Sequence, residues 1–313
     1  MEFRSVFGPV HSSRLGQSLG IDLLGDRICS FDCLYCESGR TSIQTLKRRA
    51  YVPASRVLEE VRAWSEANRV ETLDHITLGG PGEPCLNSDL AEIVRGIKQL
   101  APDIPLAVLT NASLLGDFQV RSALGSCDVI LPSLDSLVPE EFHRLNRPCP
   151  GLDPLQIAEE MIDYRSGYPG KLYLEILLVH GVNDSQANLE RMQRFCTQLD
   201  PERVDVMTMS RPGAYLQKGR VSDRVLKQWR DTLGAFTGHI AGESAVLKDT
   251  ADLGPEVEDM IVRSVSRRPQ RADQLARGLS LDRTQVEACV QQLVQKKRLK
   301  AVNIQDEVFF SSS

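Results

Sequence analysis

Short apolar runs alternate with longer amphipathic runs along most of this 313-residue chain, and this alternation limits how it can fold. The apolar runs, which we read as strands, cover residues 18–24, 75–78, 106–110, 129–134, 172–179 and 204–209. The amphipathic runs, which have the spacing of helices, cover residues 54–68, 88–100, 117–124, 153–165, 186–199 and 223–236. A repeated strand–helix order is typical of a parallel sheet with right-handed crossovers. We therefore expect an α/β fold, a partial (β/α)6 TIM-like barrel, with a doubly wound open sheet as the alternative.

The pattern changes between residues 249 and 255. Helical patterns come first and two strand-like runs follow, over residues 256–267, 271–278, 282–298, 299–304 and 308–310. Helices followed by a hairpin in this order are typical of a winged helix. We therefore expect a large α/β domain over residues 1–250 and a small winged-helix-like domain over residues 251–313.

Composition is that of an ordinary globular protein, with 42% hydrophobic and 25% charged residues. No apolar run approaches the roughly 18 residues that a membrane span needs. The first residues lack the apolar block of a secretory signal, so we expect a cytoplasmic protein with no membrane contact. Its eight cysteines are then expected to be reduced thiols, metal ligands or small buried side chains.

Charge is spread unevenly along the chain. The net charge is −5, which gives no general argument for nucleic-acid binding. Residues 267–300 nevertheless carry a balance of +6, which leaves −11 for the rest of the chain. The basic side chains on the last expected helix and just after it are Arg283, Lys296, Lys297, Arg298 and Lys300. They leave two readings open, either nucleic-acid contact through the winged helix or docking on the barrel or on a protein partner.

Polar and turn-forming residues gather where the expected strands end. They occupy residues 79–84, 111, 133–135, 180–184 and 210–213. Because the carboxyl ends of parallel strands share one edge of the sheet, these loops predict a ligand site there. Turn chemistry alone also favours Gly, Asn, Asp and Pro in such loops, so the loops by themselves do not name a reaction.

The most specific feature is a group of closely spaced cysteines, Cys29, Cys33 and Cys36, directly after the first expected strand. A structural zinc ion would take a fourth nearby Cys or His, and this spacing is not the paired C-x2-C of zinc modules. Iron–sulfur clusters are held by cysteine thiolates, normally four. Because three cysteines on a four-iron cluster leave one iron open to a reactant, we interpret the group as a reactive iron–sulfur site.

The pattern C-x3-C-x-aromatic-C, with Tyr35 in the aromatic position, resembles the signature of the radical S-adenosylmethionine (radical SAM) enzymes. The resemblance covers residues 8–245 and implies one 4Fe–4S cluster on Cys29, Cys33 and Cys36, with SAM on the open iron. One electron, from a donor such as a flavodoxin or ferredoxin, would then cleave SAM to methionine and a 5′-deoxyadenosyl radical. This radical abstracts hydrogen from a substrate, so the resemblance implies an oxidoreductase or transferase whose substrate and catalytic residues are unknown.

The same resemblance implies a set of SAM-binding residues. The positions that match the family's motifs are Gly80, Gly82, Glu83, Asn111, Ser133, Asp135 and Asn183. The glycine–glutamate motif, which includes Glu83, is expected to contact the methionyl amine. Asn111 after the third strand, and Ser133 and Asp135 after the fourth, are expected near the methionyl carboxylate and the ribose. The last position matches a fifth-strand contact with adenine. The alternative for each is a loop-capping role.

A finer resemblance rests on residues 8–20, residues 82–84 and the C-terminal segment. Together they look like Fe–S oxidoreductases related to wyosine (tricyclic tRNA base) synthases. The synthases themselves carry an additional cluster on N-terminal cysteines, whereas no Cys precedes Cys29 here. The alternative functions are therefore a tRNA or RNA base-modifying radical SAM enzyme and, in a different class, an Fe–S redox-sensing DNA-binding regulator.

Other groups carry weaker signals. The cysteines without ligand spacing are expected in the hydrophobic core; they are Cys85, Cys127, Cys149, Cys196 and Cys289. The alternative is a second cluster bound by Cys85, Cys127 and Cys149. The side chains of His11, Arg14 and His180 are candidates for facing the substrate. The basic residues 47–49 are expected in a solvated loop, with an anion clamp as the alternative.

Overall fold

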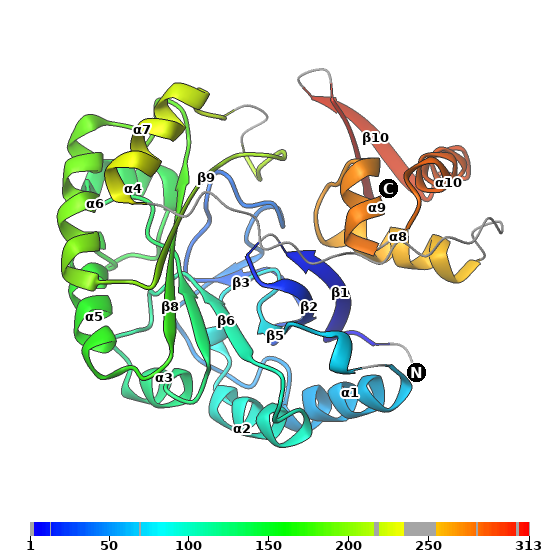
Figure 1. Cartoon of the computed structure of the whole chain (residues 1–313), viewed down its shortest axis with the longest axis horizontal. Coiled ribbons are helices and arrows are strands. Elements are labelled where there is room, and N and C mark those ends of the chain that lie inside the picture. The colour runs from blue at the N-terminus through cyan, green and yellow to red at the C-terminus, as the bar shows by residue number, and fades with distance from the viewer. Residues whose placement is uncertain are drawn as a thin grey trace.

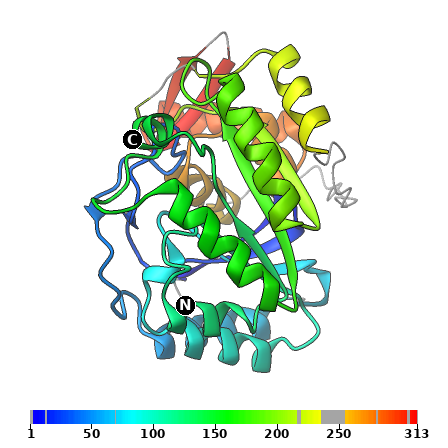
Figure 2. The ribbon, with the colours of Figure 1, turned by 90° about the vertical axis from the view of Figure 1, so that its left-hand side faces the viewer.

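The computed structural model describes residues 3–12, 14–68, 70–215, 219–234, 255–279, 281–304 and 307–312. Within these ranges, seven strands form one curved sheet in the order β1-β2-β5-β6-β7-β8-β9, and helices cover its outer side (Figure 1, Figure 2). Strand β1 runs antiparallel to β2, and the later neighbours are parallel. This arrangement agrees with the expected partial barrel and not with a doubly wound sheet, which carries helices on both faces.

The parallel strands and their crossover helices lie where the sequence pattern predicts them. The strands are β2 Gly16–Ile21, β5 His75–Leu78, β6 Leu106–Thr110, β7 Val129–Pro132, β8 Lys171–Leu178 and β9 Arg203–Thr208. The helices are α1 Ala54–Ala67, α2 Leu90–Leu100, α3 Phe118–Leu124, α5 Pro154–Gly167, α6 Gln186–Leu199 and α7 Asp223–Leu233. In the described part of the chain, no helix is long and apolar enough to cross a bilayer.

Some elements were not anticipated from the sequence. Strand β1, Val6–Ser12, contains Gly8 and Pro9, which interrupt the alternation that marks a strand, and a bulge separates its two paired parts. Helix α4, Pro139–Asn146, is a short helix that buries Phe142 and Leu145. Two short paired strands, β3 Ile28–Cys29 and β4 Ile43–Gln44, shape the loop that carries the closely spaced cysteines.

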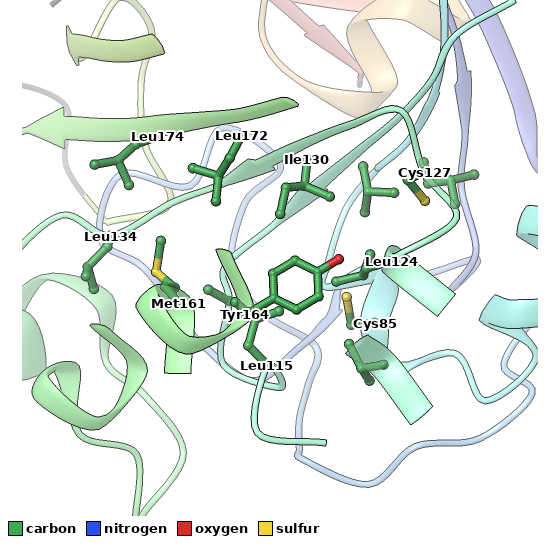
Figure 3. Close-up of a cluster of buried hydrophobic side chains, with 14 of the residues drawn as sticks. Cys85, Leu115, Leu124, Cys127, Ile130, Leu134, Met161, Tyr164, Leu172 and Leu174 are labelled. Atoms are coloured by element: carbon green, nitrogen blue, oxygen red, sulfur yellow. The ribbon is translucent and has the colours of Figure 1, made fainter. Parts of the chain in front are cut away.

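The two faces of the sheet carry different side chains, as the period of two along a strand requires. On β8, Leu172, Leu174 and Ile176 belong to the large core against the helices, whereas Tyr173 packs on the inner side with Leu15. Figure 3 shows part of that outer core, where Met161 and Tyr164 of α5 face Ile130, Leu172 and Leu174. The helices are therefore held by apolar burial, whereas the inner face carries a smaller apolar cluster together with charged groups such as Glu175.

Charged groups join the β1–β2 turn to the far strands of the open barrel. Arg14 pairs with Glu175 of β8, and the Arg203 side chain of β9 donates to the Arg14 carbonyl oxygen at 3.2 Å. Arg203 also pairs with Asp205 at 2.8 Å. Burial raises the pKa of Glu175, and the Arg14 cation opposes that rise. The barrel opening is therefore bridged at its amino end by paired charges.

The C-terminal residues form the expected elements in the expected order. They are α8 Pro255–Arg267, α9 Ala272–Leu279, α10 Arg283–Gln295, β10 Leu299–Ile304 and β11 Glu307–Ser312. A hydrophobic cluster of their own includes Ile261, Val290 and Phe310. We call residues 255–312 the C-terminal module. The predicted boundary between domains at residues 250–251 lies outside the described residues.

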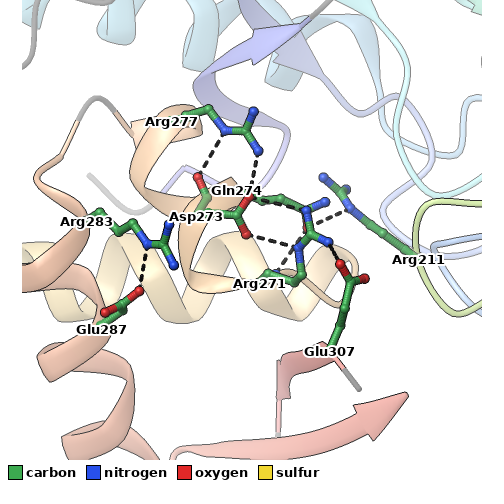
Figure 4. A network of polar contacts seen from close by, with 8 residues as sticks. All are labelled: Arg211, Arg271, Asp273, Gln274, Arg277, Arg283, Glu287 and Glu307. Carbon is green, nitrogen blue, oxygen red and sulfur yellow. Dashed lines mark hydrogen bonds and ion pairs between the residues drawn. The ribbon is translucent and has the colours of Figure 1, made fainter. Parts of the chain in front are cut away.

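The C-terminal module contacts the barrel next to the cysteine loop. Helix α9 packs against β1, and Arg211, from the loop after β9, donates to the Gln274 side chain of α9 at 3.1 Å (Figure 4). Arg211 also pairs with Glu37 at 3.2 Å, and Arg268 of the module approaches the same carboxylate at 3.5 Å. Burial lowers the pKa of Arg211 to about 10, so this side chain stays cationic at neutral pH. Glu37, the neighbour of Cys36, is thus held from both sides.

We predict that Glu60→Ala destabilises the fold, because its buried carboxylate accepts hydrogen bonds from the backbone N–H groups of Arg4, Ser5 and Val6. Leaving these donors unpaired should lower the free energy of unfolding by about 3 kcal/mol in urea titration. Glu59→Ala, on the exposed side of the same helix, is the control and should change it by less than about 0.5 kcal/mol. Equal effects of the two variants would contradict this account.

Candidate functional site

The three cysteines of the predicted cluster lie on one loop between β2 and α1. Cys29 ends β3, and the Phe31 N–H donates to its Sγ at 3.4 Å. Cys33 and Cys36 follow in a turn closed by the Cys36 N–H and the Cys33 carbonyl oxygen at 3.2 Å. All three cysteines are half-buried, and none of them is in a disulfide. The loop therefore presents thiols in a compact, hydrogen-bonded backbone frame.

The electrostatics of the loop oppose free thiolates. Burial, with the nearby Glu83 carboxylate as a further cause, raises the pKa of Cys29 to about 12. Burial also raises the pKa of Cys33, and the neighbouring Cys29 and Cys36 raise it further. A metal centre supplies the positive charge that such thiolates need, and coordinated thiols are deprotonated outright.

The donor set consists of thiols, which are the ligands that iron–sulfur clusters take. Among the described residues, no group of three or more His, Cys, Asp or Glu side chains is placed to hold a metal ion. A 4Fe–4S cluster takes one thiolate per iron, so its ligands need not meet at one point. The chemistry of these three thiols therefore fits an iron–sulfur cluster.

The glycine–glutamate loop lies directly against the cysteine loop. Gly82 bridges Ile28 in parallel register, and the Glu83 N–H donates to the Ile28 carbonyl oxygen at 3.0 Å. Gly82 has φ +151, and a Cβ there would collide with that carbonyl oxygen and with Leu24. Glycine is required at this position because the two backbones touch. Gly80 is exposed beside Asp22.

Glu83 is a buried carboxylate, only 1% exposed, with polar partners on both oxygens. Its Oε1 accepts from the Cys85 N–H at 3.0 Å and from the Thr110 hydroxyl at 2.8 Å. Its Oε2 accepts from the Asn111 N–H at 2.6 Å. Burial raises the pKa of Glu83, and these hydrogen bonds oppose the rise. A carboxylate oxygen has two lone pairs, so Oε2 retains capacity for a ligand cation.

Asn111 and Ser133 lie at the ends of adjacent strands. The Asn111 side-chain amide donates to the Ser30 hydroxyl at 2.8 Å and approaches the Cys29 Sγ at 3.5 Å. Ser133 is half-buried, and its N–H donates to the Thr110 carbonyl oxygen at 2.9 Å. The structure thus brings Cys29, Glu83 and Asn111 together at the strand ends, where a ligand site was predicted.

Asp135 and Asn183 are buried and engaged by the protein itself. The Asp135 carboxylate, in a residue 2% exposed, accepts from the Tyr35 hydroxyl at 2.6 Å, the Asn146 amide at 2.8 Å and the Leu177 N–H at 2.8 Å. The Asn183 amide donates to the Asp135 and Leu177 carbonyl oxygens and accepts from the Val179 N–H. Asn183 is fully buried, and the contacts it makes are those of a loop cap.

The weaker candidates have defined places as well. Cys85 and Cys127 lie in the outer core, labelled in Figure 3, and no metal-binding group that includes them is found in the described part of the chain. His180 is exposed beside Asp184, Arg14 is paired as described above, and the His11 side chain lies outside the described residues. In the basic segment 47–49, Arg48 pairs with Asp117.

Sequence reasoning missed several residues around the cysteine loop. Asn146 at the end of α4 reaches both Asp135 and Cys33, and Tyr215 donates its hydroxyl to Asp32 at 2.6 Å. Arg147 lies against the Tyr215 ring and pairs with Asp32 at 3.2 Å. No local spacing signal could have revealed these contacts, because they join residues from 11 to 183 positions apart.

The chain matches one family model over more than half of its length. The family model described as the Radical SAM superfamily matches residues 26–192, more than half of the chain. The chain belongs to the radical SAM superfamily. The match includes Cys29, Cys33 and Cys36 and ends within α6, and the family implies a 4Fe–4S cluster and SAM.

Two curated relatives illustrate this membership. A UPF0026 protein of Synechocystis sp. is 36% identical over 211 residues, which cover 67% of this chain and 77% of the relative. A Brachyspira hyodysenteriae protein named GTPase Obg is 28% identical over 301 residues, 96% of this chain but 44% of the relative. This chain therefore spans less than half of that longer protein. These comparisons give no support for the finer subgroup related to wyosine synthases.

A solved structure supports the fold. A radical SAM methyltransferase from Sphaerobacter thermophilus aligns with a TM-score of 0.51 at 21% identity, covering 69% of this chain and 63% of that one. At this identity the likeness concerns the fold alone. The radical SAM assignment and the open barrel thus agree.

We predict that Gly82→Ala weakens SAM binding about tenfold or more, because a Cβ would push the glycine–glutamate loop off Ile28 and strain of this kind costs about 1–3 kcal/mol. Equilibrium dialysis of the reconstituted protein with labelled SAM measures the effect. Gly167→Ala is the control, since its Cβ would enter open space at the end of α5. Unchanged SAM affinity in Gly82→Ala would contradict the close packing of the two loops.

Proposed function

We propose that this protein is a radical SAM enzyme that uses Cys29, Cys33 and Cys36 as ligands of one 4Fe–4S cluster. When bound and reduced, this cofactor pair would cleave SAM to methionine and a 5′-deoxyadenosyl radical that takes hydrogen from the substrate. The observation that carries the proposal is the packing of the glycine–glutamate loop against the cysteine loop, with Glu83 and Asn111 beside Cys29.

We assign different roles in SAM binding to the residues around the cysteine loop. Glu83 would supply a buried countercharge to the methionyl ammonium, with its carboxylate oriented by Thr110 and the Asn111 N–H. Gly80 and Gly82 would let the backbone approach the ligand, and Ser133 would offer its hydroxyl to the ribose or carboxylate. Asp135 and Asn183 would act by fixing the loops rather than by side-chain contact, since their groups are engaged.

The reaction also requires a low-potential one-electron donor, for which we propose a flavodoxin or ferredoxin. We further propose a cytoplasmic location, where a reducing environment keeps the three cysteine thiols available to iron.

We interpret the C-terminal module as a winged helix that docks on the barrel or on a protein partner. Its basic residues are largely paired inside the module: Lys296 with Glu258 at 2.7 Å, and Arg298 with Glu258 and Asp259. Arg283 pairs with Glu287 on its own helix, drawn in Figure 4. These carboxylates lower the net positive charge that α10 and its surroundings would present to a nucleic acid, which favours docking on the barrel or on a protein partner.

Anaerobic reconstitution with iron and sulfide tests the proposed function. The wild-type chain should take up about four irons and, with dithionite and SAM, release 5′-deoxyadenosine without any DNA. The variant with Ala at Cys29, Cys33 and Cys36 should lose both properties. Cys196→Ala, which removes a half-buried thiol elsewhere, is the control and should retain them. Production of 5′-deoxyadenosine by the triple variant would refute the assignment.

We predict that a chain ending at Thr250 still binds the cluster and cleaves SAM, because every residue assigned to the cofactors precedes residue 215. Turnover of the true substrate should fall, since the missing module contacts the cysteine loop through Arg268 and Glu37. Iron content and 5′-deoxyadenosine yield measure the first effect. Loss of SAM cleavage would show that the module is part of the cofactor site.

A further inference from the structure

Asn146 links the cysteine loop to the strand ends at a point that the proposed function does not use. It is the last residue of α4 and only 3% exposed. Its side-chain amide nitrogen, Nδ2, lies 3.5 Å from the Cys33 Sγ and 2.8 Å from the Asp135 Oδ2. Its backbone carbonyl accepts from the Asp32 N–H at 3.1 Å. The amide is therefore held beside a cluster ligand by the surrounding backbone.

The chemistry of its neighbours fixes the orientation of the amide. Asp135 presents a carboxylate oxygen that can only accept, and a metal-bound Cys33 presents a thiolate sulfur that also only accepts. Turning the amide over would place Oδ1 against both acceptors, so Nδ2 must face them. In the described part of the chain, Asn146 Oδ1 then has no hydrogen-bond partner. The protein thus leaves a buried acceptor unpaired while keeping the donor on the sulfur side.

A second amide is placed in the same way on another cluster ligand. The Asn111 Nδ2 lies 3.5 Å from the Cys29 Sγ, and it comes from the loop after β6 rather than from α4. Hydrogen bonds to cysteine sulfurs stabilise the more negative, reduced cluster and so raise its reduction potential. The two amides would therefore favour electron uptake at the same cluster.

We propose that Asn146 is a positioning residue that raises the reduction potential of the cluster through its hydrogen bond to Cys33. The inference rests on the proposed function, because it needs the cluster on Cys33. The relevant step is the gain of one electron by the oxidised cluster from a low-potential reductant, with no bond made or broken in the protein. Through Asp135, the same amide also ties Cys33 to Tyr35 and β8.

The test is an EPR-monitored redox titration of the reconstituted 313-residue chain, with dithionite as the reductant. Asn146→Leu keeps the branched shape of the side chain and removes the donor, so the midpoint potential should become more negative at unchanged iron content. Tyr35→Phe is the matched control, because it removes the other side-chain donor to Asp135 Oδ2 without a hydrogen bond to sulfur. Its shift should be clearly smaller.

Each result separates this inference from the proposed function. A wild-type chain that takes up no cluster would defeat the proposed function itself. An Asn146→Leu variant with full iron and the wild-type potential would overturn only the role of Asn146. Equal shifts in both variants would also overturn it, since they would assign the effect to the Asp135 charge.

A second measurement covers the case in which Asn146→Leu loses iron. The Asn111→Leu substitution removes the other amide that faces a cluster sulfur. This variant is produced with asparagine that carries 15N in its side chain, so that Asn146 supplies the labelled amide next to the sulfur. Pulsed EPR of the reduced cluster without SAM should then detect a 15N coupling from Asn146. Absence of this coupling at full iron content would overturn the inference.

Discussion

A carboxylate buried at the edge of a sheet must be satisfied by donors from several directions, and Asp135 gathers them from separate parts of the chain. Tyr35 comes from the cysteine loop, Asn146 from α4 and the Leu177 N–H from β8. The backbone carbonyl of Asp135 in turn accepts from Asn183 and Asn188. Through Tyr35, this buried carboxylate therefore helps to hold the cysteine loop on the barrel, together with the backbone hydrogen bonds that Asp32 and Leu34 donate to the end of α4.

The strand–helix order of the barrel could be read from the sequence because the parallel strands are short, buried apolar runs and the helices between them have one apolar face. Helix α4 could not, since Phe142 and Leu145 alone make too short an apolar pattern. The three cysteines were found by local spacing and Glu83 by its match to the family's glycine–glutamate motif, and the structure brings these residues together. The roles of Asn146 and Asp135 could not be predicted, because Asn146 contacts Asp135 across 11 positions and Cys33 across 113. No local sequence pattern indicates such contacts.

The basic residues near the C-terminus also make contacts that the sequence does not reveal. The sequence places an excess of basic residues between residues 267 and 300, and this suggested a surface for phosphate. In the fold, Glu258 and Asp259 of α8 lie outside that window and pair with Lys296 and Arg298. A charge balance taken along the chain therefore differs from the charge that the folded surface presents.

Glu37 connects two events that would otherwise be independent. It directly follows Cys36 and is paired both with Arg211 of the barrel and with Arg268 of the C-terminal module. If loading of the cysteine loop with iron changes how tightly the module is held, thermodynamic linkage requires docking of the module to change iron affinity by the same free energy. A partner that binds the module and weakens its docking on the barrel would therefore change the iron affinity of the cysteine loop without contacting the metal centre.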